Sequence, residues 1–329
     1  MAGEYPEPTA AKSQPAKTQT ETRAGLGGFA CAMPISTGSE LNLISLMLTL
    51  LLTSAVFAAG DKPVLHLESE FVWYDNASWF GGFSGVELSP DGQSLTIVTD
   101  RGRIVQATLH REAGSITSAE ITHSVAIRDE AGKILRKPFT DAEGLAIAPD
   151  GQHYVSFEGQ HRIVTLDMEN GVTTPFVTFP ASDFGAENSG LEALAVGADG
   201  TIYAIAEQSK GDHFPLFAFK NGEQIIAAQI PRNGPFLPVG ADFDANGRLY
   251  LLERTVTPIG FRTRIRRIDL DAPTPHSVTL IQTLPARYDN LEGISVWADA
   301  SGRTHLTLVS DDNFMPFQNT QIIEFSVID

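Results

Sequence analysis

The sequence predicts an all-β protein that forms a single β-propeller of four-stranded antiparallel blades, and three observations support this. One pattern, an apolar strand, a turn rich in Asp, Asn and Gly, and a second apolar strand, occurs five times. Further strand-like runs follow the copies, and beyond the first 59 residues no stretch keeps a helical period of apolar residues over about 11 positions. A repeat of about 50 residues that holds four short strands is typical of a propeller blade.

The five copies predict five blades. They read FSGVELSPDGQSLTIVTDRG from Phe83, AEGLAIAPDGQHYVSFEGQ from Ala142, LEALAVGADGTIYAIAEQ from Leu191, VGADFDANGRLYLLERT from Val239 and LEGISVWADASGRTHLTLVSDDN from Leu291. The Asp-Gly and Asn-Gly turns of the first four copies suit hairpins, because these residues accept positive φ. The last copy has room for three strands only, so we expect the N-terminal run PVLHLESEFVWY to complete this blade and close the ring. A sixth blade, within residues 103–139, is the alternative to this count.

Residues 1–59 are predicted to be a leader, and residues 60–329 the propeller domain. The leader holds an apolar run over residues 41–59 that ends in small residues, as a signal peptidase site requires, although no Lys or Arg lies between Arg23 and this run. An uncleaved anchor is the alternative. Polar residues inside the run, such as Asn42 and Thr49, favour a signal peptide. We therefore expect a periplasmic or secreted protein with no stable membrane insertion after cleavage.

The charge and the cysteine usage narrow the possible partners. The chain has 40 acidic and 23 basic residues and a formal net charge of −17, which argues against a nucleic-acid partner. We expect instead a metal cation and a small-molecule substrate, and a soluble monomer. The only cysteine, Cys31, lies in the leader, so the propeller domain can offer no disulfide, thiol nucleophile or thiolate metal site.

Acidic residues recur at the ends of the repeated hairpins. The first strand of each propeller blade lines the channel and the second runs antiparallel beside it. The residue that enters strand one and the residue that leaves strand two therefore lie on the same face of the disc. This geometry predicts one acidic mouth, built from Asp100, Glu143, Glu158, Glu192, Glu207, Glu253, Glu292 and Asp311 or Asp312. Ser84 and Val239 stand at the Glu143 position in the first and fourth copies, and Asp242 follows Val239 by three residues.

So many neighbouring carboxylates raise one another's pKa and must be neutralised. A hard divalent cation with six to eight oxygen ligands suits this role, so we expect Ca²⁺ as the cofactor. The expected ligands are Asp100, Glu143, Glu192, Glu207, Glu253, Glu292 and Asp311. The alternative is that the acids are solvated or paired with nearby arginines such as Arg101, Arg162 and Arg254.

The familiar catalytic motifs are missing from the sequence. It holds no G-x-S-x-G elbow, H-E-x-x-H helix, P-loop or dinucleotide fingerprint, so metal-activated water is the chemistry that remains. We expect Glu143 and Glu158 to be catalytic, with Arg101 and Arg254 orienting the substrate. Arg262, Arg264 and Arg266 alternate along a predicted strand, where they could bind phosphate or form salt bridges.

The motifs GGFSGVELSPDG, DAEGLAIAPDG, NSGLEALAVGADG, GRLYLLERTVTPIGFRTRIRRI and DNLEGISV, in this order, resemble the esterase-like phytase family of exported bacterial propeller proteins. The resemblance extends over roughly residues 68–326. It implies a hydrolase that cleaves phosphoesters or related esters. The positions that match the family pattern are Ser84, Asp100, Arg101, Glu143, Glu158, Glu192, Glu207, Glu253, Arg254 and Glu292. Phytate, a polyanion, would fit so acidic a mouth only if calcium reversed the local field.

Two other functions stay open at this point. The first is a gluconolactonase-type propeller, a family that this sequence also resembles and that carries a calcium ion in its channel. The second is a periplasmic binding or assembly propeller without enzymatic activity, in which the acids hold a structural calcium ion.

Overall fold

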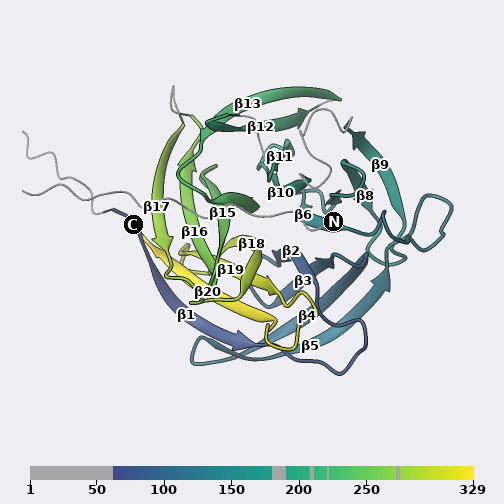
Figure 1. The fold of residues 1–329 in the computed structure, drawn as a ribbon, viewed down its shortest axis with the longest axis horizontal. Coiled ribbons are helices and arrows are strands. Elements are labelled where there is room, and N and C mark those ends of the chain that lie inside the picture. Colours follow the sequence, from purple (N-terminus) through teal and green to yellow (C-terminus); the bar gives the residue numbers. More distant parts are fainter. Residues whose placement is uncertain (1–61, 180–189, 208–210, 221, 272–274) are drawn as a thin grey trace, which may run out of the picture. The chain divides into compact units, whose positions relative to one another are not determined.

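The computed structural model describes residues 62–179, 190–207, 211–220, 222–271 and 275–329, all within the unit Gly60–Asp329. These residues form five four-stranded antiparallel sheets that are arranged around a ring (Figure 1). The predicted all-β propeller is therefore confirmed, with five blades. The predicted leader lies outside the described residues. Across the described ranges no helix has the length and apolar character of a membrane span.

Each blade runs from an inner strand at the channel to an outer strand at the rim. The first blade contains β2 (Phe83–Leu88), β3 (Ser94–Thr99), β4 (Arg103–Glu112) and β5 (Ser115–Ala126). The second contains β6 (Ala142–Ile147), β7 (His153–Phe157), β8 (Arg162–Leu166) and β9 (Thr173–Thr178). The third contains β10 (Leu191–Val196), β11 (Ile202–Ala206), β12 (His213–Lys220) and β13 (Glu223–Pro231). The fourth contains β14 (Leu237–Phe243), β15 (Leu249–Thr257), β16 (Gly260–Asp269) and β17 (His276–Gln282). The fifth contains β18 (Asn290–Ala298), β19 (Thr304–Asp311), β20 (Gln321–Ile328) and β1 (Val64–Val72).

The N-terminal strand closes the ring, as the sequence predicts. β1 pairs with β20 in antiparallel register, from Val64 opposite Ile328 to Val72 opposite Gln321. The extra length of the first repeat forms the long strands β4 and β5 and a loop with two isolated bridges at Arg128. The described residues therefore hold no sixth blade.

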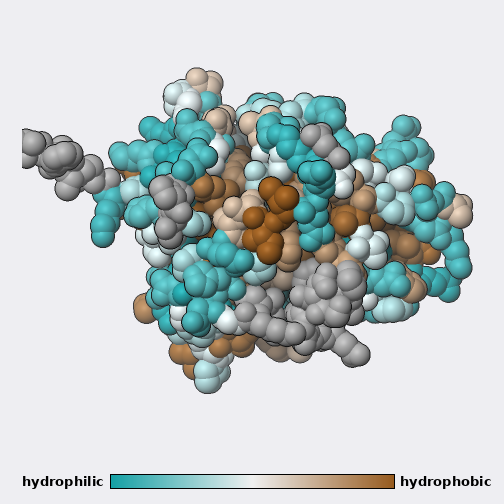
Figure 2. Space-filling model, turned by 90° about the horizontal axis from the view of Figure 1, so that it is seen from above, coloured by the Kyte–Doolittle hydropathy of each residue, from teal (hydrophilic) through white to brown (hydrophobic). Residues whose placement is uncertain are grey.

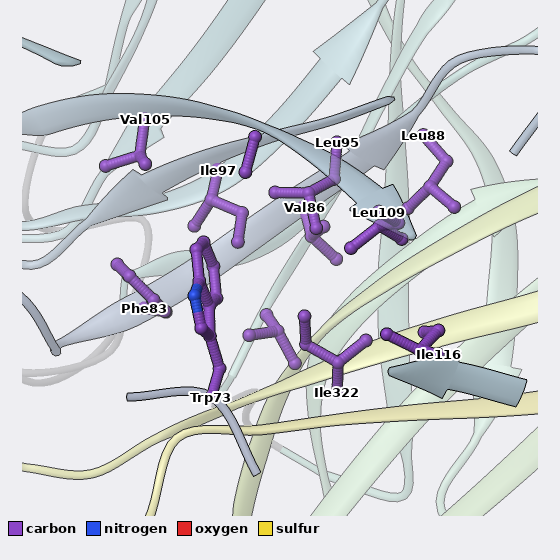
Figure 3. Close-up of a cluster of buried hydrophobic side chains, with 12 residues drawn as sticks. Trp73, Phe83, Val86, Leu88, Leu95, Ile97, Val105, Leu109, Ile116 and Ile322 are labelled. Carbon is purple, nitrogen blue, oxygen red and sulfur yellow. The ribbon is translucent and has the colours of Figure 1, made fainter. Parts of the chain in front are cut away.

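The hydrophobic core is divided among the five seams between neighbouring blades. Each of five clusters of buried side chains combines residues from two adjacent blades. At the seam that closes the ring, Trp73 points from the end of the N-terminal segment toward Phe83 and Ile97 of the first blade, near Ile322 of the last (Figure 3). The Trp73 and Phe83 ring centroids are 5.3 Å apart. Burial of these large side chains joins the first and last repeats.

The outer strands contribute less to this core. The rim seen in Figure 2 is mostly hydrophilic, with a group of hydrophobic side chains near its middle. The outermost strand of the third blade, β13, exposes Ile225 and Ile226 and buries little of its length. The inner strands, which surround the channel, are instead buried on both faces over most of their length.

Around the channel the inner strands approach one another so closely that glycine is required. A Cβ added to Gly85 would lie 2.4 Å from the backbone nitrogen of Leu145, and one added to Gly293 would lie 2.2 Å from the carbonyl oxygen of Ser84. Gly144 and Gly240 occupy the equivalent positions in β6 and β14, where an added Cβ would lie 3.1 Å from the carbonyl oxygen of Glu192 and 2.7 Å from that of Glu292. Backbone therefore packs on backbone from blade to blade.

We predict that Gly293→Ala lowers the free energy of unfolding by about 2 kcal/mol, because the added methyl group has no space and the opposing atom is backbone. Urea denaturation measures this change. Ser118→Ala, on the exposed face of β5, is the control and should shift stability by less than about 0.5 kcal/mol. Equal stability of the two variants would contradict the close approach of β18 and β2.

Candidate active site

The five inner strands share one irregularity at the same end of the ring. The pairing of each inner strand with its neighbour is interrupted by a β-bulge near its first residues. The residues placed in the bulges are Ser84, Glu143, Glu192, Val239 and Glu292. A bulge removes its residue from the ladder and changes the direction of the side chain. Three glutamates and one serine are thus displayed around one mouth of the channel.

The second strand of each blade adds a residue at the same level. Backbone hydrogen bonds and strand register place Asp100 opposite Gly82, Glu158 opposite Asp141, Glu207 opposite Gly190, Arg254 opposite Leu237 and Asp311 opposite Asn290. These positions are equivalent, because each partner lies two residues before the bulge. The predicted mouth is therefore present, with one change: the fourth blade contributes Arg254 and not an acid.

Glu253 does not lie at the mouth, in contrast to its expected role as a metal ligand. It lies one residue before Arg254 and on the opposite side of β15, where it is fully buried. Its carboxylate accepts hydrogen bonds from Arg264 Nε at 2.6 Å and from Arg266 Nη2 at 2.7 Å. Arg264 and Arg266 therefore form salt bridges, which was one of the two roles expected for them, and Glu253 is their partner inside the fourth blade.

The two guanidinium groups also tie the fourth blade to the segment that enters it. Arg264 Nη1 donates to the carbonyl oxygen of Asn233 at 2.6 Å, and Arg266 Nη1 donates to that of Pro231 at 3.0 Å. The buried group of Glu253, Arg264 and Arg266 thus holds β16 against the connection from β13 to β14.

Asp242 also lies away from the mouth. It is buried further along the channel, where its carboxylate accepts hydrogen bonds from the backbone nitrogens of Phe243 at 2.7 Å and Val296 at 2.5 Å. Burial raises the pKa of Asp242 to about 7. Burial and the nearby charge of Asp242 raise the pKa of Glu87 well above its usual range. These two acids form a separate pair inside the ring.

The mouth itself has two chemically different halves, and the first is acidic. One carboxylate oxygen from each of Asp141, Glu143 and Glu158 lies within 4.8 Å of the others. Asp141 is absent from the sequence prediction, although it stands two residues before Glu143. Next to this group, the Oγ atom of Ser84 and one carboxylate oxygen of Asp100 are buried without a hydrogen-bond partner among the described residues. A cation would complete such a group of closely spaced carboxylate oxygens, with two unpartnered oxygens beside it.

Arg254 occupies the second half of the mouth. Its guanidinium donates to Asn290 Oδ1 at 2.5 Å, to the Glu292 carboxylate, and to Glu207 Oε1 at 3.4 Å. Asn290 Nδ2 donates in turn to Glu292 Oε1 at 2.7 Å. The arginine therefore forms ion pairs with both Glu207 and Glu292, which is the arginine pairing that the sequence left open as the alternative for these acids. Asn290 is the second residue that the sequence prediction missed.

The other two arginines named from the sequence do not repeat this arrangement. Arg101 is exposed, and its guanidinium carbon lies 3.0 Å from the centroid of the Phe314 ring. Arg162 donates to the carbonyl oxygen of Phe139 at 2.8 Å and lies over the Phe157 ring. Among the described residues, neither forms an ion pair with the acid of its own blade.

Several carboxyl groups of the mouth hold protons more tightly than usual. Loss of water contact, followed by the charges of Glu192 and Glu292, raises the pKa of Glu143 well above its usual range. Burial and the charge of Glu292 raise the pKa of Asp311 to about 8. Burial also raises the pKa of Asp100 to about 6, although the nearby Arg101 opposes this shift. In the absence of a cation the mouth disfavours its own ionisation.

We predict that Glu253→Gln lowers the free energy of unfolding by about 3 kcal/mol, because it leaves two buried guanidinium groups without a counter-charge. Urea denaturation measures this loss. Glu223→Gln, at an exposed position of β13, is the control and should leave stability unchanged. A role for Glu253 as a metal ligand predicts a different result, namely a loss of the response to calcium at nearly unchanged stability.

We also predict that the free energy of unfolding of the metal-free protein falls as the pH rises from about 4 to about 8. The folded state keeps protons on Asp311 and Asp100 up to pH values of about 8 and about 6, whereas the unfolded chain loses them near pH 4. Urea denaturation with a chelator across this range tests the slope. Asp311→Asn should flatten it, whereas the exposed-site control Asp212→Asn should not; a slope that rises with pH would contradict the raised pKa values.

Comparisons with known proteins identify the family of the chain. A family model for Phytase-like proteins, described as having the esterase-like activity of phytase, matches residues 78–314. No curated protein matches the chain.

Three solved structures illustrate the structural matches. One is a protein of unknown function from Dyadobacter fermentans, with 12% identity, coverage of 80% of this chain and 98% of that chain, and a TM-score of 0.47. Another is the PQQ-bound aldose sugar dehydrogenase from Streptomyces coelicolor, with 17% identity, coverage of 77% of this chain and 82% of that chain, and a TM-score of 0.40. The third is an inactive virginiamycin B lyase from Staphylococcus aureus with quinupristin, with 13% identity, coverage of 81% of this chain and 100% of that chain, and a TM-score of 0.40. At these scores they carry no argument about function. The match to the family model covers most of the chain, with strands from every blade, and the chain belongs to the Phytase-like family.

Proposed function

We propose that this protein is an exported, calcium-dependent hydrolase that cleaves phosphoesters or related esters at the acidic mouth of the propeller. The observation that carries the proposal is the division of the mouth into two halves. Arg254 forms ion pairs with Glu207 and Glu292 in one half, whereas Asp141, Glu143 and Glu158 form no ion pair among the described residues, although Lys137 lies near Asp141. The family to which the chain belongs, with its description as esterase-like, supports a hydrolase.

The residues of the acidic half fit a calcium ion. Calcium takes six to eight oxygen ligands in flexible geometry, and the donors here are all oxygens from carboxylates and one hydroxyl. Asp141, Glu143 and Glu158 would hold the ion, with Asp100 and Ser84 beside them. A zinc site would call for His or Cys ligands, and this group contains neither. When bound, the ion would neutralise the acids, polarise a substrate oxygen and lower the pKa of a bound water molecule.

The protein residues would supply orientation and proton transfer. Glu143 and Glu158 enter the mouth from adjacent strands of one blade, and both keep part of their surface exposed, so either can exchange a proton with a water molecule at the mouth. Arg254 is held in one position by three acceptors, two of them carboxylates, and would orient a substrate oxygen next to the acids. Arg101, exposed beside Asp100, would contact the substrate from the opposite side.

Calcium titration and turnover test this proposal together. Calcium at about 100 times its Kd should raise the free energy of unfolding by about 2.7 kcal/mol, measured as a rise in melting temperature. Glu143→Gln should diminish this rise and lower kcat/KM by about 100-fold on a panel of phosphoesters, carboxylesters and lactones. The variant should remain folded, since it removes a charge from a repulsive cluster.

Glu112→Gln, at an exposed position on the rim, is the matched control and should keep both the calcium response and the turnover. No shift of the melting temperature with calcium would contradict the metal site. A shift without turnover on any substrate would support a structural calcium ion in a binding propeller, and turnover of lactones alone would support a lactonase.

A further inference from the structure

A groove of about 490 Å³ lies between the fourth and fifth blades at the mouth end of the ring. Three segments form its walls: the hairpin between β15 and β16 with Ile259 and Phe261, the connection that leads into β18, and the connection between β19 and β20 with Phe317. The volume lies in the range of small-molecule sites.

Hydrogen bonds fix these walls in place. The backbone nitrogen of Ala286 donates to the carbonyl oxygen of Phe261 at 2.9 Å, which ties the hairpin to the connection before β18. Gln318 Nε2 donates to Asp289 Oδ1 at 2.8 Å, and the backbone nitrogen of Asn319 donates to Asp289 Oδ2 at 2.7 Å. The groove is therefore formed before any ligand binds.

The groove lies next to the arginine half of the mouth. Phe261 lines the groove, and its ring centroid lies 5.9 Å from the guanidinium carbon of Arg254. Asp289 lines it as well and directly precedes Asn290, whose side chain accepts a hydrogen bond from the same arginine. A molecule with one end at Arg254 could therefore extend its other end into the groove.

The charged groups of the groove already have partners. Asp289 accepts hydrogen bonds from the segment Gln318–Asn319, and Arg287 forms an ion pair with Glu70 of β1. Two apolar side chains, in contrast, remain open to solvent: Ile259 is 72% exposed and Phe317 is 74% exposed. Such a lining favours an uncharged apolar ligand and offers little to a second phosphate group.

From this we infer that the groove is a specificity subsite for the apolar part of the substrate, an aromatic or branched aliphatic group on the ester oxygen. This inference rests on the proposed function and narrows it: the preferred substrates are monoesters of an apolar alcohol or phenol, and a polyphosphorylated polyol is a poor substrate. The anionic or carbonyl end lies at the mouth, and the leaving group lies against Ile259, Phe261 and Phe317.

Matched substrates and two groove variants test the inference in the calcium-loaded protein. The substrates are 1-naphthyl and methyl phosphate, and 1-naphthyl and methyl acetate. Ile259→Ser and Phe317→Ala should each raise KM for the naphthyl esters about tenfold and leave the methyl esters unchanged. Leu284→Ser, which removes an exposed apolar side chain outside the groove, is the control and should change neither.

A binding measurement keeps the inference separate from the proposed function. Titration of 1-naphthol into the Glu143→Gln variant, followed by fluorescence, should show binding that weakens about tenfold in Glu143→Gln/Phe317→Ala. If the panel shows no turnover but this difference is found, the subsite is supported and the hydrolase proposal fails. Equal binding in both variants, or equal KM effects on methyl and naphthyl esters, would overturn the subsite. So would self-association of the wild type that Phe317→Ala abolishes, since the groove would then be an interface between copies.

Discussion

Where the five inner strands meet around the channel, backbone lies directly against backbone, and most of the site follows from that contact. Glycines in four strands and Ala193 in the fifth allow the approach, and the residue just before each of them lies in a bulge. A side chain at the small position would separate the blades, whereas a side chain at the bulge is directed to the mouth. In each dipeptide the small residue allows the blades to pack and the residue before it directs its side chain to the mouth. This explains why an acid can stand beside an otherwise apolar strand.

The charge of the mouth is balanced unevenly, so its two halves differ in chemistry. A ring of acids alone would be strongly self-repelling, and a ring in which every acid had its own arginine would be inert. Here one guanidinium group serves Glu207 and Glu292, while Asp141, Glu143 and Glu158 share no such partner among the described side chains. The two halves are suited to different parts of one ligand. Under the proposed function, the acidic half would bind a cation, and in the other half Arg254 would orient a substrate oxygen.

The repeats made the fold predictable from the sequence, because five copies of one hairpin leave few alternatives to a ring, and the three-stranded last copy required a strand from the N-terminus. The mouth was predictable wherever a copy carries an acid at both ends of its hairpin. The fourth copy broke this rule. Arg254 follows Val239 by 15 positions, as Glu158 follows Glu143 and Glu207 follows Glu192, so counting from the bulge identifies Arg254 where matching by charge selected Glu253.

Asp141 and Asn290 were missed for a related reason. Both stand two residues before a bulge, and a regular strand would give no special meaning to that spacing. The bulge alone brings them to the level of the mouth. The groove beside Arg254 could not be anticipated at all, because its walls come from three connections that lie far apart in the sequence.

The pairing of β1 with β20 has a consequence for the way in which the molecule is made. The strand that closes the last blade is the first of the propeller to be synthesised, and its partner is the last. Four blades can form in sequence order as each hairpin is completed, but the seam around Trp73 has no second half until residue 328 is available. Closure therefore joins the most distant parts of the chain, which is the slowest kind of contact to form. Until that step the first blade presents an unprotected apolar flank, so the growing chain depends on a late event to become a ring.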